Sequence, residues 1–178
     1  MAEENAKSQF SFQEGDEVVY PTHGVGKIQA IEKQSVGGIE MELIIVHLEN
    51  EKLKLSIPQA KVASVGLRPL SDQPTIDRAM ATLKKRPRHS KLQWNRQSQA
   101  YEEKIHSGDL VSISEVARDL YYPNDQLERS YARKELFDTA LSRLVEEIAA
   151  INDEDPVNVA TSLSDILEKS SEERNALD

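Results

Sequence analysis

The sequence predicts an α+β protein in which a small β-barrel is followed by an all-α helical bundle. Up to about Leu67 the apolar residues fall in short runs separated by turn residues, as strands require, whereas from Ser71 their period becomes helical. The chain of 178 residues is also long enough for two small domains. We therefore expect a β domain over residues 10–68, a helical domain over 71–168 and an acidic flexible tail over 169–178.

The β domain is expected to contain strands rich in Val, Ile, Leu and Tyr, at about residues 16–20, 26–34, 39–48 and 53–57. Gly37-Gly38 joins two of these runs and predicts a tight hairpin, because glycine readily adopts the positive φ angles that such a turn needs. Leu53, Leu55 and Ile57 alternate with polar residues, which indicates a half-buried strand. Four or five short, strongly bent strands are typical of a barrel of the SH3 or Tudor type.

The helical domain is expected to contain helices at about residues 71–86, 91–106, 112–121 and 127–151, and a short final helix from 156 onward. Pro87 and Pro123 end two of them, since proline disrupts a helix interior. In the third helix Ser112 is the expected N-cap, with Glu115 as its capping-box partner. The second half of the chain therefore reads as a bundle.

The composition describes a globular protein, with 38% of residues apolar and 30% charged. Residues 1–13 hold no apolar run, so neither a secretory signal nor a membrane span is expected there. The absence of cysteine from the sequence excludes disulfides and thiolate metal sites, and it suits a reducing compartment. We expect a cytoplasmic protein.

Negative charge is concentrated near the C-terminus. The formal net charge is −9, and residues 146–178 alone carry −8 of it. The field that matters for a nucleic acid is that of the surface facing the phosphates, so the overall acidity does not exclude such a partner. A chain with this charge balance binds free DNA poorly, and we expect a partner protein to place it there.

Trp94 is the only tryptophan, and it lies near the end of a stretch without acidic residues that runs from Arg78 to Tyr101. The nearby cations are Lys84, Lys85, Arg86, Arg88, Lys91 and Arg96. A flat ring among cations suits a nucleic acid, because the ring can stack on bases while the cations pair with phosphates. The alternative is a core tryptophan whose neighbouring charges form a solvated helix face. The local sequence leaves both interpretations open.

Motifs with a characteristic order and spacing run through both halves of the chain. They are Gly15-Asp16-Glu17-Val18-Val19-Tyr20-Pro21-Thr22-His23-Gly24-Val25-Gly26, Ile57-Pro58, Val62 with Ser64-Val65-Gly66-Leu67-Arg68, Trp94-Asn95-Arg96, Ser107-Gly108-Asp109, Val116-Ala117-Arg118-Asp119-Leu120-Tyr121 and Asp138-Thr139-Ala140. Together they span roughly residues 12–168 and resemble the CarD/CdnL family of bacterial transcription regulators. The first module of that family is shared with the transcription-repair coupling factor.

The resemblance implies a Tudor-like barrel that binds the β subunit of RNA polymerase and a helical module that contacts promoter DNA upstream of the transcription bubble. A tryptophan of the family wedges into the minor groove at the upstream fork and hinders bubble collapse, which implies this role for Trp94. The implied DNA contacts are Trp94, Asn95, Arg96, Arg86, Arg88 and Lys91, with Arg133 and Lys134 as a second candidate group. Gln97 stands where some relatives have a further arginine.

The implied polymerase contacts are Gln34, Lys54, Ser56, Ile57 and Pro58, on one edge and face of the barrel. Ile57 also reads as a core residue, and arginines occupy the positions of Gln34 and Ser56 in some relatives. We expect a monomer that uses no cofactor and no metal, since no two of the four histidines have helical ligand spacing. No nucleophile, base and orienting group occur in a recognisable pattern, so we expect no enzymatic activity.

Two other functions stay open on the sequence alone. An RNA-binding adaptor would use the basic segment around Trp94 to stack single-stranded bases. The β domain argues against it, because Tyr20 is its only tyrosine and aromatic and basic residues do not alternate there. A pure protein-interaction module would bury Trp94 between helices.

Overall fold

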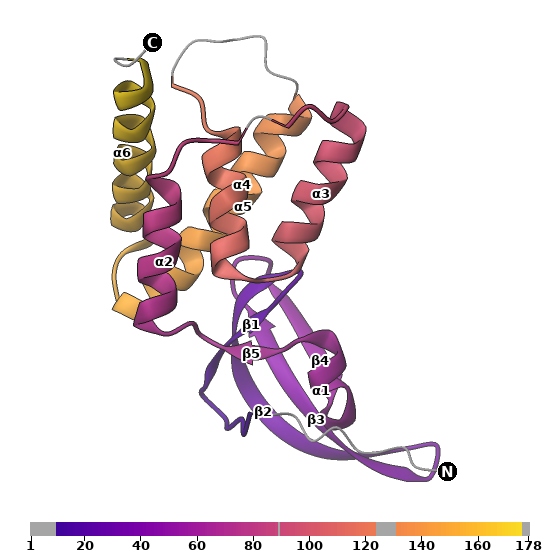
Figure 1. Ribbon diagram of the computed structural model, residues 1–178. Helices are drawn as coiled ribbons and strands as arrows, with labels where there is room; N and C mark the ends of the chain where they lie inside the picture. Colours follow the sequence, from indigo (N-terminus) through magenta and orange to yellow (C-terminus); the bar gives the residue numbers. More distant parts are fainter. Residues whose placement is uncertain (1–9, 89, 124–130, 176–178) are drawn as a thin grey trace. The chain divides into compact units, whose positions relative to one another are not determined.

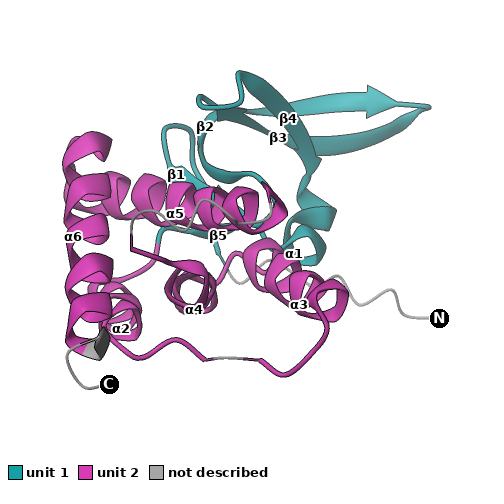
Figure 2. Cartoon of the chain, turned by 90° about the horizontal axis from the view of Figure 1, so that it is seen from above, with its two compact units in different colours: residues 1–70 teal, residues 71–178 magenta. Residues whose placement is uncertain are grey.

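The computed structural model describes residues 10–88, 90–123 and 131–175, and the chain divides into two compact units (Figure 1, Figure 2). Unit 1 comprises residues 1–70 and unit 2 comprises residues 71–178. Unit 1 contains the strands and unit 2 the long helices, which confirms the predicted α+β class. Within the described ranges, no helix is both long and apolar enough to cross a membrane.

Unit 1 is a five-stranded antiparallel sheet with the strand order β4-β3-β2-β1-β5. Its strands are β1 (Glu17–Tyr20), β2 (Gly24–Val36), β3 (Ile39–Leu48), β4 (Leu53–Pro58) and β5 (Arg68–Pro69). The prediction of a closed barrel is wrong, because no pairing among the described residues joins β4 to β5. β5 has only two residues, one of which is a proline without an N–H to donate, so it offers little ladder for closure.

The predicted hairpin at Gly37-Gly38 is confirmed. Val36 pairs with Ile39 across the turn, and the two glycines have positive φ angles of 62° and 81°. Neither β1 nor β4 reaches past the cross-strand pair of Glu32 and Leu43. The rest of the hairpin therefore projects as a two-stranded arm (Figure 1).

The core of unit 1 is formed by buried side chains from β1 to β4 and from the segment after β4: Val18, Ile28, Ile44, Val46, Leu48, Ile57, Val62 and Leu67. That segment contains a 3₁₀ turn, η1 (Gln59–Lys61), and a short helix, α1 (Val62–Val65), neither of which the sequence predicts. Gly26 allows β2 to approach β3 closely. A Cβ atom there would lie 2.7 Å from Val46 Cγ1 and 2.8 Å from Leu48 Cδ2.

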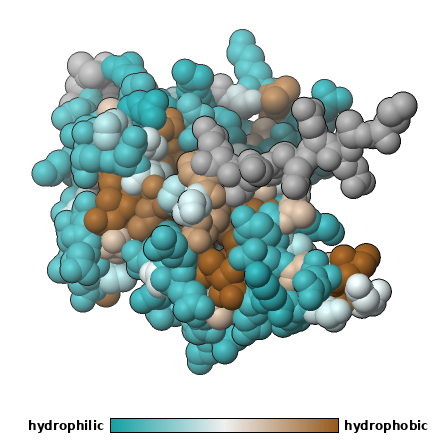
Figure 3. Space-filling view, turned by 90° about the horizontal axis from the view of Figure 1, so that it is seen from below, coloured by the Kyte–Doolittle hydropathy of each residue, from teal (hydrophilic) through white to brown (hydrophobic). Residues whose placement is uncertain are grey.

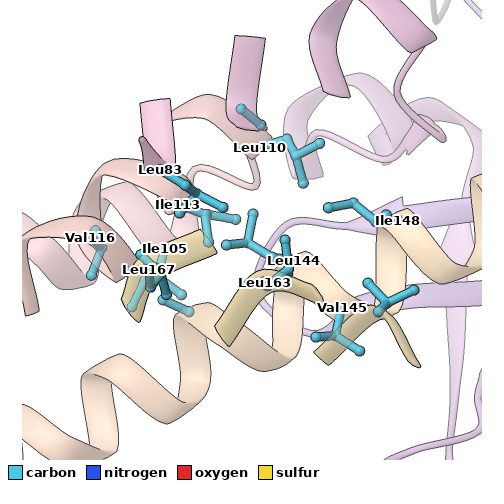
Figure 4. Close-up of a cluster of buried hydrophobic side chains, with 14 of the residues drawn as sticks. Leu83, Ile105, Leu110, Ile113, Val116, Leu144, Val145, Ile148, Leu163 and Leu167 are labelled. Carbon is cyan, nitrogen blue, oxygen red and sulfur yellow. The ribbon is translucent and has the colours of Figure 1, made fainter. Parts of the chain in front are cut away.

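Unit 2 is a bundle of α2 (Gln73–Leu83), α3 (Trp94–His106), α4 (Leu110–Leu120), α5 (Tyr131–Asn152) and α6 (Pro156–Asn175). α4 contacts α2, α3 and α5, so it lies at the centre of the bundle, while α6 packs on α5 and α2. Figure 4 shows Leu110, Ile113, Leu144, Leu163 and Leu167 in one apolar cluster that draws on α4, α5 and α6. This core positions the helix ends around it.

The helix starts differ from the predictions. The N-cap of α4 is Asp109, whose carboxylate accepts hydrogen bonds from the Ser112 N–H at 2.8 Å and the Ser112 hydroxyl at 2.7 Å. Ser112 thus lies inside the helix, and the predicted capping box is wrong because an equally good capping residue occurs earlier in the chain. α3 begins at Trp94 rather than at Lys91. Residues 127–130, where we expected the start of α5, lie outside the described residues.

The acidic tail predicted over residues 169–178 is helical as far as it is described. α6 continues to Asn175, and the Ser171 side chain is buried, with 2% exposed. The Ser170 hydroxyl donates to the backbone carbonyl of Lys84 at 3.2 Å, just after α2. The local charge pattern does not predict this packing, because the contact is made with a distant part of the chain. Residues 176–178 lie outside the described residues.

Candidate nucleic-acid interface

Trp94 is the first residue of α3, and its ring is half-buried at the margin of the bundle core. The guanidinium carbon of Arg133, on α5, lies over the ring at 4.5 Å from its centroid. This distance is within the range of a cation–π interaction. The ring is therefore neither free in solvent nor sealed inside the bundle. It is an edge residue held by a neighbouring helix.

The start of α3 adds positive potential to this site. Gln93 has an extended backbone and its carbonyl accepts the N–H groups of Arg96 and Gln97, at 3.0 and 3.1 Å, so the helix begins at Trp94. No acidic residue occurs in the first turn of the helix. The positive end of the helix dipole and the exposed Arg96 side chain thus lie beside the ring. Such a helix end favours negatively charged groups.

The predicted cations before Trp94 have exposed side chains, namely Arg86, Arg88 and Lys91. Their segment is tied to α4 through its backbone, since the Arg88 N–H donates to Asp119 Oδ1 at 2.9 Å. Asp119 also accepts a hydrogen bond from Arg118 Nε at 2.7 Å, and the two side chains are only 6% and 4% exposed. A buried ion pair therefore fixes part of the cationic segment.

Three further side chains on α3 and α4, Tyr101, Lys104 and Glu115, were not assigned to this site from the sequence. Tyr101 is buried, its hydroxyl accepts a hydrogen bond from Gln97 Nε2 at 3.1 Å, and burial followed by the charge of Asp119 raises its pKa. Lys104 Nζ donates to Glu115 Oε2 at 2.6 Å, and this bond lowers the pKa of the Glu115 carboxyl. The first bond lies within α3 and the second joins α3 to α4, and the sequence could have signalled them only through the aromatic and charged residue types.

An exposed apolar side chain occurs two residues before each partner of the Trp94–Arg133 stack. Leu92 is 54% exposed and Tyr131 is 80% exposed. The face shown in Figure 3 is mainly hydrophilic, and hydrophobic residues gather there in separate areas. Large apolar groups beside cations suit a ligand with both apolar faces and negative charge.

The remaining candidate DNA-binding residues lie at other positions on α3 and α5. Asn95 is exposed on the first turn of α3, one residue after the ring. Lys134 is exposed on α5 and forms an i,i+4 ion pair with Asp138 at 3.2 Å. The structure thus brings Arg133 onto Trp94, whereas Lys134 is paired with a carboxylate of its own helix. His89, in the basic segment, lies outside the described residues.

The candidate polymerase residues of unit 1 are distributed over an edge and the arm. Lys54 and Ser56 are exposed on β4, which is an edge strand of the sheet. Ile57 is 5% exposed and belongs to the core, which favours the core interpretation of its side chain, and Pro58 is half-buried at the end of the strand. Gln34 lies on the arm, where its Nε2 donates to Glu32 Oε2 at 3.1 Å. No group of three or more His, Asp or Glu side chains in the described ranges is arranged to hold a metal.

Comparisons with known proteins match both units. The profile of the CarD-like/TRCF RID domain matches residues 12–71, and that of the CarD C-terminal domain matches residues 78–164. A putative transcription factor of Bacillus subtilis (strain 168), YdeB, is 27% identical over 140 residues, which cover 79% of this chain and 92% of the relative. The solution structure of the 72-residue N-terminal domain of Myxococcus xanthus CarD shares 29% identity, covering 35% of this chain and 83% of that one, with a TM-score of 0.30.

Proposed function

The chain belongs to the CarD/CdnL family of bacterial transcription regulators, and on that premise we propose that it is a non-catalytic regulator of promoter opening. Unit 1 binds the β subunit of RNA polymerase, and unit 2 stabilises the open complex by wedging Trp94 into the minor groove at the upstream edge of the bubble. The observation that supports this most is the half-buried Trp94 ring at a helix start, among exposed cations, with Arg133 over the ring.

The physical basis is the stacking of an aromatic ring on a base step. At the edge of a melted duplex, the unstacking cost of a few kcal/mol has already been met, so a ring can occupy the step without separating bases itself. Stacking of this kind contributes about 1 to 3 kcal/mol, which corresponds to roughly a five- to hundred-fold shift of the opening equilibrium. Arg96 and the exposed cations before Trp94 then pair with phosphates, which holds the ring in register without reading sequence.

Polymerase binding compensates for the weak affinity of an acidic chain for DNA. With a net charge of −9, the protein gains little from non-specific attraction to phosphates, but tethering to polymerase raises its effective concentration at the fork. The open edge of β4 is suited to pairing with a strand of the β subunit. Lys54 and Ser56 would then contact the partner through their side chains, and the buried Ile57 through its backbone.

The opening activity is tested with Trp94→Ala in a promoter-opening assay that follows a fluorophore in the DNA. We expect stabilisation of the open complex to fall roughly five- to hundred-fold. Val157→Ala is the matched control, because it removes an exposed apolar side chain from α6, outside the Trp94 segment. An unchanged opening equilibrium with folded Trp94→Ala protein contradicts the proposed function.

The docking activity is tested by pull-down with the polymerase β subunit. The double variant Lys54→Glu, Ser56→Glu places two carboxylates on the β4 edge and should weaken capture, whereas Lys61→Glu reverses one lysine charge on η1 and should not. Failure of the wild-type protein to bind the β subunit would reject this part of the proposal.

A protein-interaction adaptor remains the second candidate, because the Trp94 ring packs against the bundle core. In that case Trp94→Ala should destabilise unit 2 by about 3 to 5 kcal/mol, as for a core tryptophan, and leave promoter opening unaffected once the protein is folded. A wedge at the core margin predicts a smaller loss of stability together with a large loss of opening activity.

A further inference from the structure

We infer that Arg133 is a positioning residue for Trp94, which acts on promoter opening through the ring rather than through a phosphate. This inference rests on the proposed function and assigns Arg133 a role different from the direct DNA contact expected from the sequence. The observation that carries it is the guanidinium of Arg133 lying over the indole at 4.5 Å from the ring centroid.

The stack joins the beginnings of two helices. Trp94 opens α3, and Arg133 lies in the first turn of α5, while α3 and α5 also contact each other in the bundle. A ring at a helix start is held on one side by its backbone and otherwise rotates about its side-chain torsions. A guanidinium on one face removes much of this freedom. The exposed part of the ring is then presented to a base step in one orientation.

Arginine suits this role better than lysine. Its guanidinium is planar and weakly hydrated, so it can lie flat on an aromatic face and retain N–H groups at its edge, whereas the ammonium of lysine is a compact and strongly hydrated charge. The attraction between cation and ring strengthens when both are desolvated. Docking of the ring against DNA removes water from the stack and therefore tightens it at the moment when the ring has to be held.

The surroundings of Arg133 restrict the movement of its side chain. Its positive charge, like that of Arg118, partly offsets the rise in the pKa of Tyr101 that burial causes, so Arg133 interacts with the Tyr101 hydroxyl as well as with the ring. Lys134, the next residue, is exposed and paired with Asp138 on its own helix. The two neighbouring cations on α5 thus lie in different environments, and this difference provides a matched control.

The first arm of the test uses the protein alone. Because Trp94 is the only tryptophan, its fluorescence and its quenching by acrylamide report this ring directly. We expect Arg133→Lys and Arg133→Met to make the ring more accessible and to increase the quenching constant, while Lys134→Met leaves it unchanged. Far-UV circular dichroism verifies that each variant is folded, and Arg133→Lys remains informative if the methionine variant is unstable.

The second arm measures promoter opening with polymerase in a double-mutant cycle. Arg133→Met and Arg133→Lys should each reduce opening about two- to fivefold in the presence of Trp94, as expected for loss of a partly exposed cation–π contact. In the Trp94→Ala background, the same substitutions should have no further effect. The salt dependence should also stay the same, because no phosphate contact is lost.

The outcomes separate the inference from the function on which it rests. If Trp94→Ala leaves opening unchanged, both the proposed function and the positioning role fail. If Trp94→Ala reduces opening but Arg133→Lys behaves as the wild type in quenching and opening, only the inference fails, and a charge contact with DNA explains the residue. An additive effect of Arg133→Met in the Trp94→Ala background likewise overturns it.

Discussion

The β4 edge of unit 1 and the Trp94 site of unit 2 present residues to partners in different ways. On β4, the exposed Lys54 and Ser56 alternate with side chains that face the core, and the strand has an open edge. At the Trp94 site, one ring from α3 is stacked by Arg133 of α5, and the preceding segment is hydrogen bonded to Asp119 of α4. The β4 edge presents mainly its backbone to a partner, whereas the Trp94 site presents individual side chains.

This difference predicts different responses to substitution. Backbone pairing tolerates most conservative side-chain changes, so binding at the β4 edge should fall only with strong changes such as the added charges of Lys54→Glu, Ser56→Glu. The helical site depends on contacts between helices that are remote in sequence, so a single replacement there alters geometry as well as chemistry. Substitutions in the two units test that contrast.

Replacement of Asp119 by alanine should have the largest effect on stability. It leaves the Arg118 guanidinium, 4% exposed and with Nη2 already lacking a hydrogen-bond partner, buried without its carboxylate. Removing one partner of a buried ion pair costs about 3 to 5 kcal/mol. Urea denaturation followed by Trp94 fluorescence measures the loss. The exposed Asp138→Ala is the control and should cost far less. Equal effects of the two variants would show that the buried pair does not hold the site.

Gly26→Ala should destabilise unit 1 by about 1 to 3 kcal/mol, because the new methyl group overlaps with Val46 and Leu48. Trp94 lies in unit 2, so fluorescence reports that unit while circular dichroism reports both. We expect the unfolding transition seen by circular dichroism to begin at a lower urea concentration than the transition seen by fluorescence. Gln29→Ala, at an exposed position of the same strand, is the control. Coincident shifts in both signals would contradict independent units.

Asp109→Ala should destabilise unit 2 by about 1 kcal/mol, since it removes the N-cap of α4. Ser112→Ala should cost less, because its backbone N–H can still bond to Asp109 and only the hydroxyl contact is lost. Thermal melting of the two variants decides between the caps. A larger loss of stability for Ser112→Ala would support Ser112 as the N-cap, as the sequence predicted.

The smallest effect concerns pH. The hydrogen bond from Lys104, aided by the charge of Lys104, lowers the pKa of Glu115 in the folded state. A carboxyl whose pKa is lower in the folded than in the unfolded state contributes stability above its unfolded pKa, and this contribution disappears as the pH falls through the folded pKa. Glu115→Gln should therefore lose stability at neutral pH and differ little from the wild type in acid. Urea midpoints at pH 7 and near pH 3 measure this, and a constant difference would contradict it.

The features set by local sequence were predictable. The Gly37-Gly38 turn was predictable because positive φ at both positions is a local property. The change from strand to helix periodicity near Ser71 was predictable as well. The cap of α4 was misplaced because Asp109 and Ser112 are both good capping residues, and only the packing of the helix decides which of them precedes its first turn. The open sheet was missed because closure depends on the length of β5, a two-residue strand.

The sequence nominates members of the candidate site, but it does not indicate their geometry. The basic stretch and the single tryptophan identify the segment around Trp94, yet nothing local indicates that Arg133 lies over its ring or that Asp119 holds the Arg88 backbone. Both contacts join helices that only the tertiary fold brings together. The helical course of residues 169–175 was hidden for the same reason, since Ser170 bonds to the carbonyl of Lys84.

The central claim is that the Trp94 ring, held at the margin of the bundle, prolongs the life of the open promoter. The most direct test measures open-complex lifetime with polymerase for the wild type and Trp94→Ala, beside the urea midpoint of each protein. We predict a roughly five- to hundred-fold shorter lifetime, with a stability loss of about 1 to 2 kcal/mol for a half-buried ring. An unchanged lifetime with folded Trp94→Ala protein would contradict this account.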